Sequence, residues 1–254
     1  MGKMLLVKFH ESGRFNSGEL LVANRTSAKL DEIRDFAVVG SNSEVAEAAD
    51  LVFVCVRPVD MKAVLSEIGP VLKDDALLIT LNGSITFDMI KKVVDHKTAK
   101  VIPSLTAEIG RSQTIVSYNG LVEDRDKKNL TELLGTIGNV IELPENEVGM
   151  GSELVSCMPG FIASIFDVIC NSAKKHTEIP DDQIVKMVLQ TMSATGDLML
   201  QKDMTFEDVV RRVATPGGIT EEGTKVVYEE FPGTADKIFE KTLEKRRQTA
   251  AKNK

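Results

Sequence analysis

The segment Asp50-Leu51-Val52-Phe53-Val54-Cys55-Val56-Arg57-Pro58 decides the fold class of this chain. Its six central residues are all apolar and are bounded by charged residues and a proline, which is typical of a fully buried strand. A strand that is apolar on both sides belongs in a parallel sheet that helices cover on both faces. Residues 60–68, which follow, have helical periodicity, so strand and helix alternate at this point.

This alternation continues through the whole first half of the chain. It builds right-handed βαβ units and a parallel sheet between two layers of helices. The sequence therefore predicts an α/β domain, with strands over 19–23, 37–39, 51–56, 76–81 and 100–102 and helices over 1–11, 27–34, 44–49, 60–68 and 87–94. We expect Ser43 to cap the helix over 44–49.

The second half of the chain is different, because strand signals fade after Pro144. Helical periodicity predicts a long first helix, interrupted or kinked near Pro159-Gly160, where proline removes a backbone donor. The predicted helices span 148–175, 181–200, 205–213, 220–230 and 234–247. We therefore expect two domains, a sheet domain over residues 1–144 and an all-helical domain over residues 145–254.

Composition excludes several classes of protein. The 254 residues carry 31 Lys and Arg against 38 Asp and Glu, a net charge of -7, which argues against a dedicated nucleic-acid binder. The chain contains no continuous run of about 18 apolar residues, so we expect no membrane span and a cytoplasmic protein. Three cysteines and three histidines lack metal-ligand spacing. They predict no metal site, and we expect the cysteines to be buried core residues.

Two loops follow predicted strands at the edge where doubly wound sheets bind ligands. Asn24-Arg25-Thr26 carries no acid, and Arg25 offers a guanidinium to the 2′-phosphate of NADP; the alternative is a solvated surface arginine. Val56-Arg57-Pro58 is expected beneath a cofactor ribose or diphosphate. Its alternative is the start of a helix with Pro58 in the first turn.

Two further features belong to the same edge of the sheet. Ile102-Pro103-Ser104-Leu105-Thr106 is a proline-fixed turn that presents two hydroxyls after a strand. At the other end, a dinucleotide fold opens with a strand and a G-x-G-x-x-G turn, whereas this sequence begins at Met1-Gly2 without one. We interpret Gly2 as the last glycine of such a turn, with the first strand upstream of residue 1.

The segment Ala214-Thr215-Pro216-Gly217-Gly218-Ile219-Thr220 leads into a helix. Its two glycines let the backbone approach a ligand, and the free N–H groups of a helix start favour an anion. A substrate carboxylate is the natural ligand. The alternative is an ordinary turn between two helices with Thr220 as the N-cap.

Five segments of the chain together resemble the pyrroline-5-carboxylate reductases, with the ComER-like late-competence branch as the most similar part of that family. They occur in the family's order and span essentially the whole chain. The segments are V-A-N-R-T at 22–26, F-V-C-V-R-P at 53–58, V-I-P-S-L-T at 101–106, S-E-L-V-S-C-M-P-G-F at 152–161 and V-A-T-P-G-G-I-T-E-E-G at 213–223.

The resemblance implies a Rossmann domain followed by a helical domain that dimerises. It implies NADPH-dependent reduction of 1-pyrroline-5-carboxylate to L-proline, with NADH as the alternative cofactor, in a homodimer or larger homo-oligomer. The cofactor residues that it implies, together with the turns described above, are Gly2, Asn24, Arg25, Thr26, Val56, Arg57, Pro58, Pro103 and Ser104. The substrate residues that it implies are Thr215, Gly217, Gly218, Ile219 and Thr220, with the Thr220 hydroxyl as the catalytic group at the ring nitrogen.

The chain departs from the family pattern at several positions. Ser104 and Leu105 replace an asparagine and a threonine of the usual M-P-N-T-P, and Met158 stands where S-G-S-G-P-A has a glycine. These departures keep a second hypothesis open, a catalytically impaired regulatory or cofactor-binding relative of the same fold. A β-hydroxyacid dehydrogenase is disfavoured, because its first long helix would need a lysine and residues 148–171 contain none.

Overall fold

The computed structural model describes residues 1–16 and 18–252, apart from the side chain of Ser27. The chain forms two compact units, the first from residues 1–159 with 243–254 and the second from residues 160–242. The division predicted at 144 rests on sequence and stays a prediction. Each unit is described by itself below.

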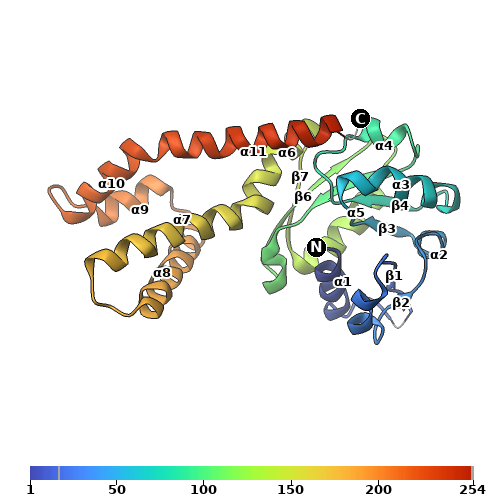
Figure 1. The fold of residues 1–254 in the computed structure, drawn as a ribbon, viewed down its shortest axis with the longest axis horizontal. Coiled ribbons are helices and arrows are strands. Elements are labelled where there is room, and N and C mark those ends of the chain that lie inside the picture. The colour runs from blue at the N-terminus through green and yellow to red at the C-terminus, as the bar shows by residue number, and fades with distance from the viewer. Residues whose placement is uncertain (17, 253–254) are drawn as a thin grey trace. The chain divides into compact units, whose positions relative to one another are not determined.

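A five-stranded sheet forms the centre of the first unit (Figure 1). Its strands lie in chain order, β3 (Leu51–Val54), β4 (Leu77–Thr80), β5 (Thr98–Ile102), β6 (Ser112–Tyr118) and β7 (Gly138–Glu142). All neighbours are parallel except β5 and β6, which run antiparallel. The prediction of an α/β fold with a mainly parallel sheet is confirmed. The sequence did not reveal β6 or the helix α5 (Asp124–Leu134) that follows it.

A separate parallel pair, β1 (Leu21–Val22) with β2 (Val38–Val39), precedes this sheet in the chain. Among the described residues β1 pairs only with β2 and β3 only with β4, so each has one edge without a strand. The strand expected upstream of residue 1 stays a prediction. The helix predicted over 27–34 forms instead as two 3₁₀ turns, η1 (Ser27–Lys29) and η2 (Asp31–Ile33).

Helices cover both faces of the five-stranded sheet, as expected. On one face, α1 (Gly2–Glu11) and α5 bury Leu5, Phe9 and Leu130 against the apolar residues of β4 and β5. On the other, α2 (Asn42–Ala48), α3 (Pro58–Ile68) and α4 (Phe87–Lys91) pack against Val52, Val54 and Leu78. The cap of α2 is Ser41 rather than Ser43, because Ser41 and Glu44 have the spacing of a capping box.

One charged side chain lies inside this sheet. Lys100 on β5 is only 2% exposed, and its Nζ lies 2.5 Å from Oε1 of Glu145 and 4.7 Å from the centre of the Phe87 ring. The same carboxylate oxygen accepts the backbone N–H of Phe87 at 2.7 Å. Burial lowers the pKa of Lys100, and Glu145 opposes that shift.

The long first helix is interrupted near Pro159, by a turn that begins six residues earlier, at Glu153. It consists of α6 (Val148–Ser152), a π-helical turn η7 (Glu153–Cys157) and α7 (Met158–Ala173). A π turn shifts the hydrogen-bonding register, which accommodates the missing N–H of Pro159 just after it. Residues 145–176 also contain an 18-residue window with mean hydropathy 1.6, long and apolar enough by composition to cross a membrane. Only 11% of that window is buried.

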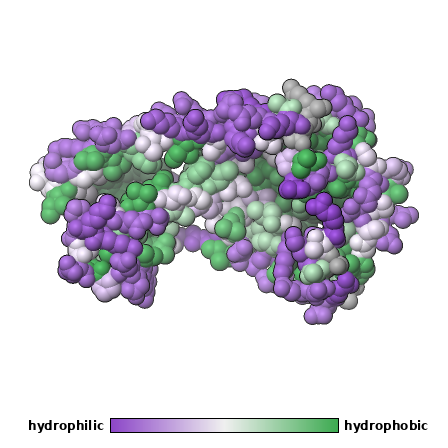
Figure 2. Space-filling view, viewed as in Figure 1, coloured by the Kyte–Doolittle hydropathy of each residue, from purple (hydrophilic) through white to green (hydrophobic). Residues whose placement is uncertain are grey.

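The second unit is entirely helical in its regular structure. It contains most of α7, then α8 (Asp181–Lys202), α9 (Phe206–Val213), α10 (Ile219–Glu230) and the first part of α11 (Pro232–Lys252). A capping box between Thr205 and Asp208 starts α9, as the sequence predicts for Thr205. Many large apolar side chains of this unit are exposed, among them Val168 at 67% and Leu200 at 79% (Figure 2).

Candidate functional site

The amino end of α1 lies against the carboxyl end of β3. A Cβ on Gly2 would lie 2.9 Å from the Cβ of Cys55, so a side chain there would force the helix away from the strand. No side chain caps α1, and its first turn has no acidic residue. The first N–H groups of this helix are therefore available for an anion such as a diphosphate.

The structure contradicts the expectation that all three cysteines are buried core residues. Only Cys170 is buried, while Cys157 is partly buried and Cys55 is exposed. Desolvation of the sulfur nevertheless raises the pKa of Cys55 to about 11. A raised pKa favours the protonated Cys55 thiol at neutral pH, which is the less nucleophilic form.

The loop after β1 presents a free cation. Oδ1 of Asn24 accepts the backbone N–H of Thr26 at 2.9 Å, which closes a turn around Arg25. All three side chains are exposed. Among the described side chains Arg25 has no ion-pair partner, so its charge is available to a ligand.

The loop after β3 is held by a residue that the sequence interpretation missed. Nδ2 of Asn82, in the loop after β4, donates to the carbonyl of Val56 at 3.1 Å. Arg57 precedes α3 and its Nε donates to Asp60 at 3.0 Å, while Pro58 is the first residue of that helix. The signal for Asn82 was its position directly after a predicted strand, at the ligand edge of the sheet.

The turn after β5 is more enclosed than its sequence indicates. Pro103 is buried, and Ser104 is 2% exposed. The Ser104 oxygen accepts the N–H of Thr106 at 3.4 Å, and the Thr106 hydroxyl donates to the carbonyl of Arg111 at 2.9 Å. Both hydroxyls are therefore used inside the turn, whereas Leu105 is 56% exposed. The cofactor role of Pro103 and Ser104 stays a prediction.

A buried ion pair lies within the first unit beside these loops. Glu153, 1% exposed, accepts from Nη2 of Arg246 at 2.7 Å. The guanidinium lies so close to Gly83 that a Cβ there would be 2.9 Å from its Nη1. Both residues after the end of β4 therefore take part in tertiary contacts. Asn82 donates a hydrogen bond to Val56, and Gly83 leaves room for the guanidinium of Arg246. The sequence interpretation missed this pair, because its members are 93 residues apart.

The second unit brings the predicted substrate residues together in one turn and one helix start. Thr215, Gly217 and Gly218 form the turn, and Gly218 is the N-cap of α10. Gly217 has a φ of +72°, which glycine adopts without strain. A Cβ on Gly218 would lie 2.5 Å from Oγ1 of Thr215, so position 218 has no room for a side chain.

Ile219 and Thr220 are the first two residues of α10, so Thr220 is not the N-cap. Both side chains are exposed, and within the described residues the Thr220 hydroxyl makes no hydrogen bond. The backbone N–H groups of these two residues precede the first intrahelical hydrogen bond. Because the first intrahelical bond runs from the N–H of Glu222 to Gly218, this helix start offers the N–H groups of residues 219–221 and one hydroxyl to a ligand.

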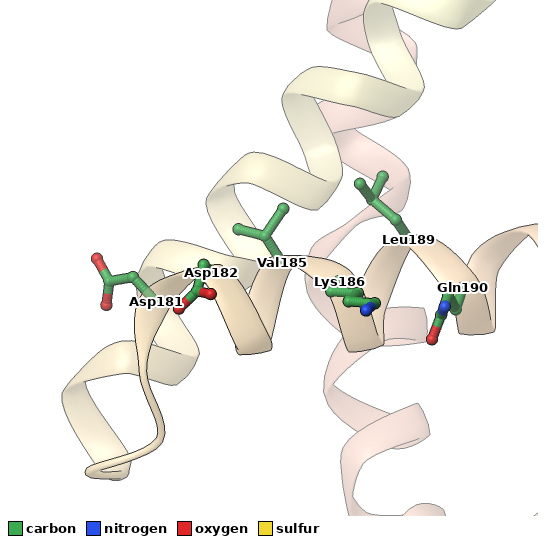
Figure 3. A pocket seen from close by; sticks show the side chains of 6 residues that line it. All are labelled: Asp181, Asp182, Val185, Lys186, Leu189 and Gln190. Carbon is green, nitrogen blue, oxygen red and sulfur yellow. The ribbon is translucent and has the colours of Figure 1, made fainter.

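An open groove of about 510 Å³ runs along α8 (Figure 3). Val185 and Leu189 point to the same side of the helix, whereas Lys186 and Gln190 point away from that side. None of the predicted site residues lines this groove. We assign it to the exposed apolar surface of the second unit and not to the chemistry. Within the described residues, His, Cys, Asp and Glu side chains form no metal-binding group of three or more.

Two family models match the chain. Residues 145–249 match the model described as pyrroline-5-carboxylate reductase dimerisation. Residues 1–83 match the model described as NADP oxidoreductase, coenzyme F420-dependent. The chain thus has a Rossmann-like sheet domain followed by a helical dimerisation domain, as the sequence predicts.

Individual relatives extend this similarity over nearly the whole chain. Pyrroline-5-carboxylate reductase 3 of Bacillus subtilis is 26% identical over 96% of this chain and 92% of its own length. ComE operon protein 4 of the same organism is 23% identical over 95% of this chain and 90% of its own length. The resemblance to the pyrroline-5-carboxylate reductases and to the ComER-like branch is confirmed.

Solved structures have the same fold. The pyrroline carboxylate reductase of Plasmodium falciparum, solved with NADP bound, superposes with a TM-score of 0.89 at 21% identity. The match covers 98% of this chain and 94% of that one. The 1-pyrroline-5-carboxylate reductase of Streptococcus pyogenes gives a TM-score of 0.85 at 19% identity, with 96% and 95% covered.

Proposed function

We propose that this relative of the pyrroline-5-carboxylate reductases reduces 1-pyrroline-5-carboxylate to L-proline with NADPH. The observation that carries the proposal is the start of α10, where the unbonded N–H groups of residues 219–221 and the free hydroxyl of Thr220 lie together. This set matches a cyclic imine acid, because the N–H groups suit its carboxylate and the hydroxyl suits its ring nitrogen.

The first unit has the features that NADPH needs. The uncapped start of α1 at Gly2 suits the diphosphate, and the unpaired guanidinium of Arg25 suits the 2′-phosphate. Val56, Arg57 and Pro58 lie at the same edge of the sheet. The side chain of Asn82 donates a hydrogen bond to the Val56 carbonyl there. NADH is the alternative cofactor, and the Arg25 charge is the reason to favour NADPH.

The protein's own part in the reaction is to bind and orient the imine. When bound, reduced nicotinamide supplies the hydride that adds to the C=N carbon. The N–H groups of Ile219 and Thr220 hold the substrate carboxylate, and the Thr220 hydroxyl hydrogen-bonds the ring nitrogen and keeps its proton in place. A protonated imine is already electrophilic, so the site needs no histidine or lysine base.

Replacement of Thr220 by valine tests the catalytic role. We expect turnover of 1-pyrroline-5-carboxylate to fall about 100-fold, because a hydrogen bond to the reacting nitrogen is lost. The dissociation constant for NADPH should stay unchanged. Thr220→Ser should restore most of the turnover. Thr224→Val is the matched control, because that hydroxyl donates to the Glu221 carbonyl at 3.0 Å, inside the same helix. Unchanged turnover in Thr220→Val would refute this role.

Replacement of Arg25 by alanine tests the cofactor preference. We expect the dissociation constant for NADPH to rise about 30-fold and that for NADH to stay within about twofold, because only NADPH has a 2′-phosphate. Titration of the protein with each cofactor measures both constants. Arg34→Ala is the control, since this exposed arginine pairs with Asp31 at 3.5 Å. Equal losses for both cofactors would show that Arg25 does not read the phosphate.

We also propose a homodimer or larger homo-oligomer in the cytoplasm, without a membrane or nucleic-acid partner. The match to a dimerisation domain and the exposed apolar side chains of the second unit support this assembly. On this proposal the apolar run in residues 145–176 meets a second subunit instead of lipid. A regulatory relative is the alternative, favoured by the similarity to ComE operon protein 4 and by Met158 and Leu105.

Oxidation of NADPH in the presence of 1-pyrroline-5-carboxylate separates the two functions. Loss of NADPH absorbance together with formation of proline supports the reductase. Binding of NADPH without reduction of any cyclic imine acid favours the regulatory protein. If the chain neither reduces 1-pyrroline-5-carboxylate nor binds NADPH, both the reductase and the regulatory proposal are refuted.

A further inference from the structure

A carboxylate of the chain itself reaches into the predicted substrate loop. Oε2 of Glu221 accepts the backbone N–H of Gly217 at 2.8 Å. Glu221 is the third residue of α10, so its side chain folds back over the start of its own helix, as in a capping box. The contact fixes Gly217 in the left-handed conformation from which the helix begins.

This contact decides which amides are left for a ligand. The N–H of Gly218 donates to the Thr215 carbonyl at 2.8 Å, and that of Gly217 is taken by Glu221. Residues 217–220 are all predicted substrate residues, but the N–H groups of two of these four are used inside the loop. Only those of Ile219 and Thr220 remain, and they flank the predicted catalytic hydroxyl.

The charge of Glu221 is partly offset. Nζ of Lys225, one turn further along α10, lies 3.7 Å from Oε2 of Glu221 and 2.7 Å from Oε1 of Glu222. Without this lysine two carboxylates would stand uncompensated where an anionic substrate binds. Glu222 shares the lysine, but among the described residues its side chain bonds no loop amide. It is therefore a matched comparison for Glu221.

We propose that Glu221 is a positioning residue for the substrate carboxylate. By holding Gly217 it orients the start of α10, so that the N–H groups of Ile219 and Thr220 receive the carboxylate and set the imine nitrogen against the Thr220 hydroxyl. The acceptor oxygen performs this role, and the negative charge is incidental to it. This inference rests on the function proposed above and adds to it the residue that sets the geometry of the carboxylate subsite.

The test compares Glu221→Ala, Glu221→Gln and Glu222→Ala on two imines. 1-Pyrroline-5-carboxylate uses the carboxylate subsite, whereas 1-pyrroline has no carboxylate. We expect Glu221→Ala to raise the KM for 1-pyrroline-5-carboxylate about tenfold, the effect of losing one ordered hydrogen bond, and to leave the kinetics of 1-pyrroline within about twofold. Glu221→Gln keeps an acceptor oxygen and should restore the KM, and Glu222→Ala should resemble the unchanged chain.

Other outcomes overturn the proposal. Equal losses on both imines mean that Glu221 only stabilises the helix, and a Glu221→Gln variant as impaired as Glu221→Ala means that charge, not the hydrogen bond, matters. If the unchanged chain reduces neither imine, the proposed function fails, and binding of L-proline and of prolinamide then decides. Weaker binding of L-proline alone to Glu221→Ala upholds the subsite, while no binding of L-proline by the unchanged chain refutes it.

Discussion

Replacement of Glu145 by alanine is expected to destabilise the first unit by about 2–4 kcal/mol. The change leaves the Lys100 ammonium, 2% exposed, without the carboxylate that lies 2.5 Å away. Removing one partner of a fully buried ion pair costs about 3–5 kcal/mol, and we lower that range because Glu145 is itself 35% exposed. The loss also frees the N–H of Phe87. Chemical denaturation followed by circular dichroism measures the free energy of unfolding.

The loss of stability in Glu145→Ala is expected to depend on pH. Burial lowers the pKa of Lys100, and Glu145 raises it, so the variant lowers it further. A lysine whose folded pKa lies below its unfolded value binds fewer protons when folded, so stability rises with pH between the two values. The deficit of Glu145→Ala should therefore shrink from neutral pH toward the ordinary lysine pKa of about 10.4.

Two further variants control this experiment. Glu147→Ala removes an exposed carboxylate from the same 3₁₀ turn, η6 (Glu145–Glu147), and should change stability by less than about 0.5 kcal/mol. The pair Lys100→Met with Glu145→Gln removes both charges and should recover most of the loss, because an apolar group replaces the buried ammonium. If Glu145→Ala alone is as stable as the unchanged chain, the prediction is wrong and the Lys100 ammonium is solvated.

Replacement of Val168 by aspartate is expected to convert the proposed dimer into a monomer. Val168 lies on α7 and is 67% exposed in the isolated chain, within the region that matches a dimerisation domain. An unpaired carboxylate in an apolar interface costs several kcal/mol, which raises the dimer dissociation constant about 100-fold or more. Sedimentation velocity over a range of protein concentrations measures that constant.

Asn171→Asp is the matched control for the dimer. It adds the same charge to the same helix at an exposed polar position, and we expect the dimer to persist. Leu200→Asp on α8, where the side chain is 79% exposed, tests whether a second helix belongs to the interface. A dimer that survives both apolar replacements would place the interface elsewhere on the chain.

Local sequence patterns predicted much of this fold. The strand over 51–56, the helix over 60–68 and the capped helix that starts at Thr205 all form close to where the patterns place them. Apolar periodicity and caps are local properties, so a single sequence displays them. The strand Ser112–Tyr118 begins with three polar residues and has only two adjacent aliphatic ones, so neither an apolar run nor strict alternation marks it as a strand.

The candidate site likewise has features that the local sequence predicts and features that it does not. The turn around Arg25 and the glycines at 217 and 218 follow from residue type and spacing, because their geometry is set within a few residues. Asn82 was missed because its side chain serves a different strand, 26 residues earlier in the chain. The backbone N–H of Ser104 donates to the Ser112 hydroxyl at 3.1 Å, a contact that forms only after β5 and β6 pair.

The sequence by itself determined the alternation of strand and helix, the helical second half, the family resemblance and the turns around Arg25 and Gly217. Only the three-dimensional structure decided the antiparallel place of β6, the ion pairs of the buried Lys100 and Glu153, and the contact of Glu221 with the Gly217 amide. The physical reason is that periodicity and turn chemistry act over a few residues, whereas the burial of a charge depends on which distant groups pack around it. Even for Glu221, four residues from Gly217, the sequence shows the spacing but not the rotamer that closes the contact.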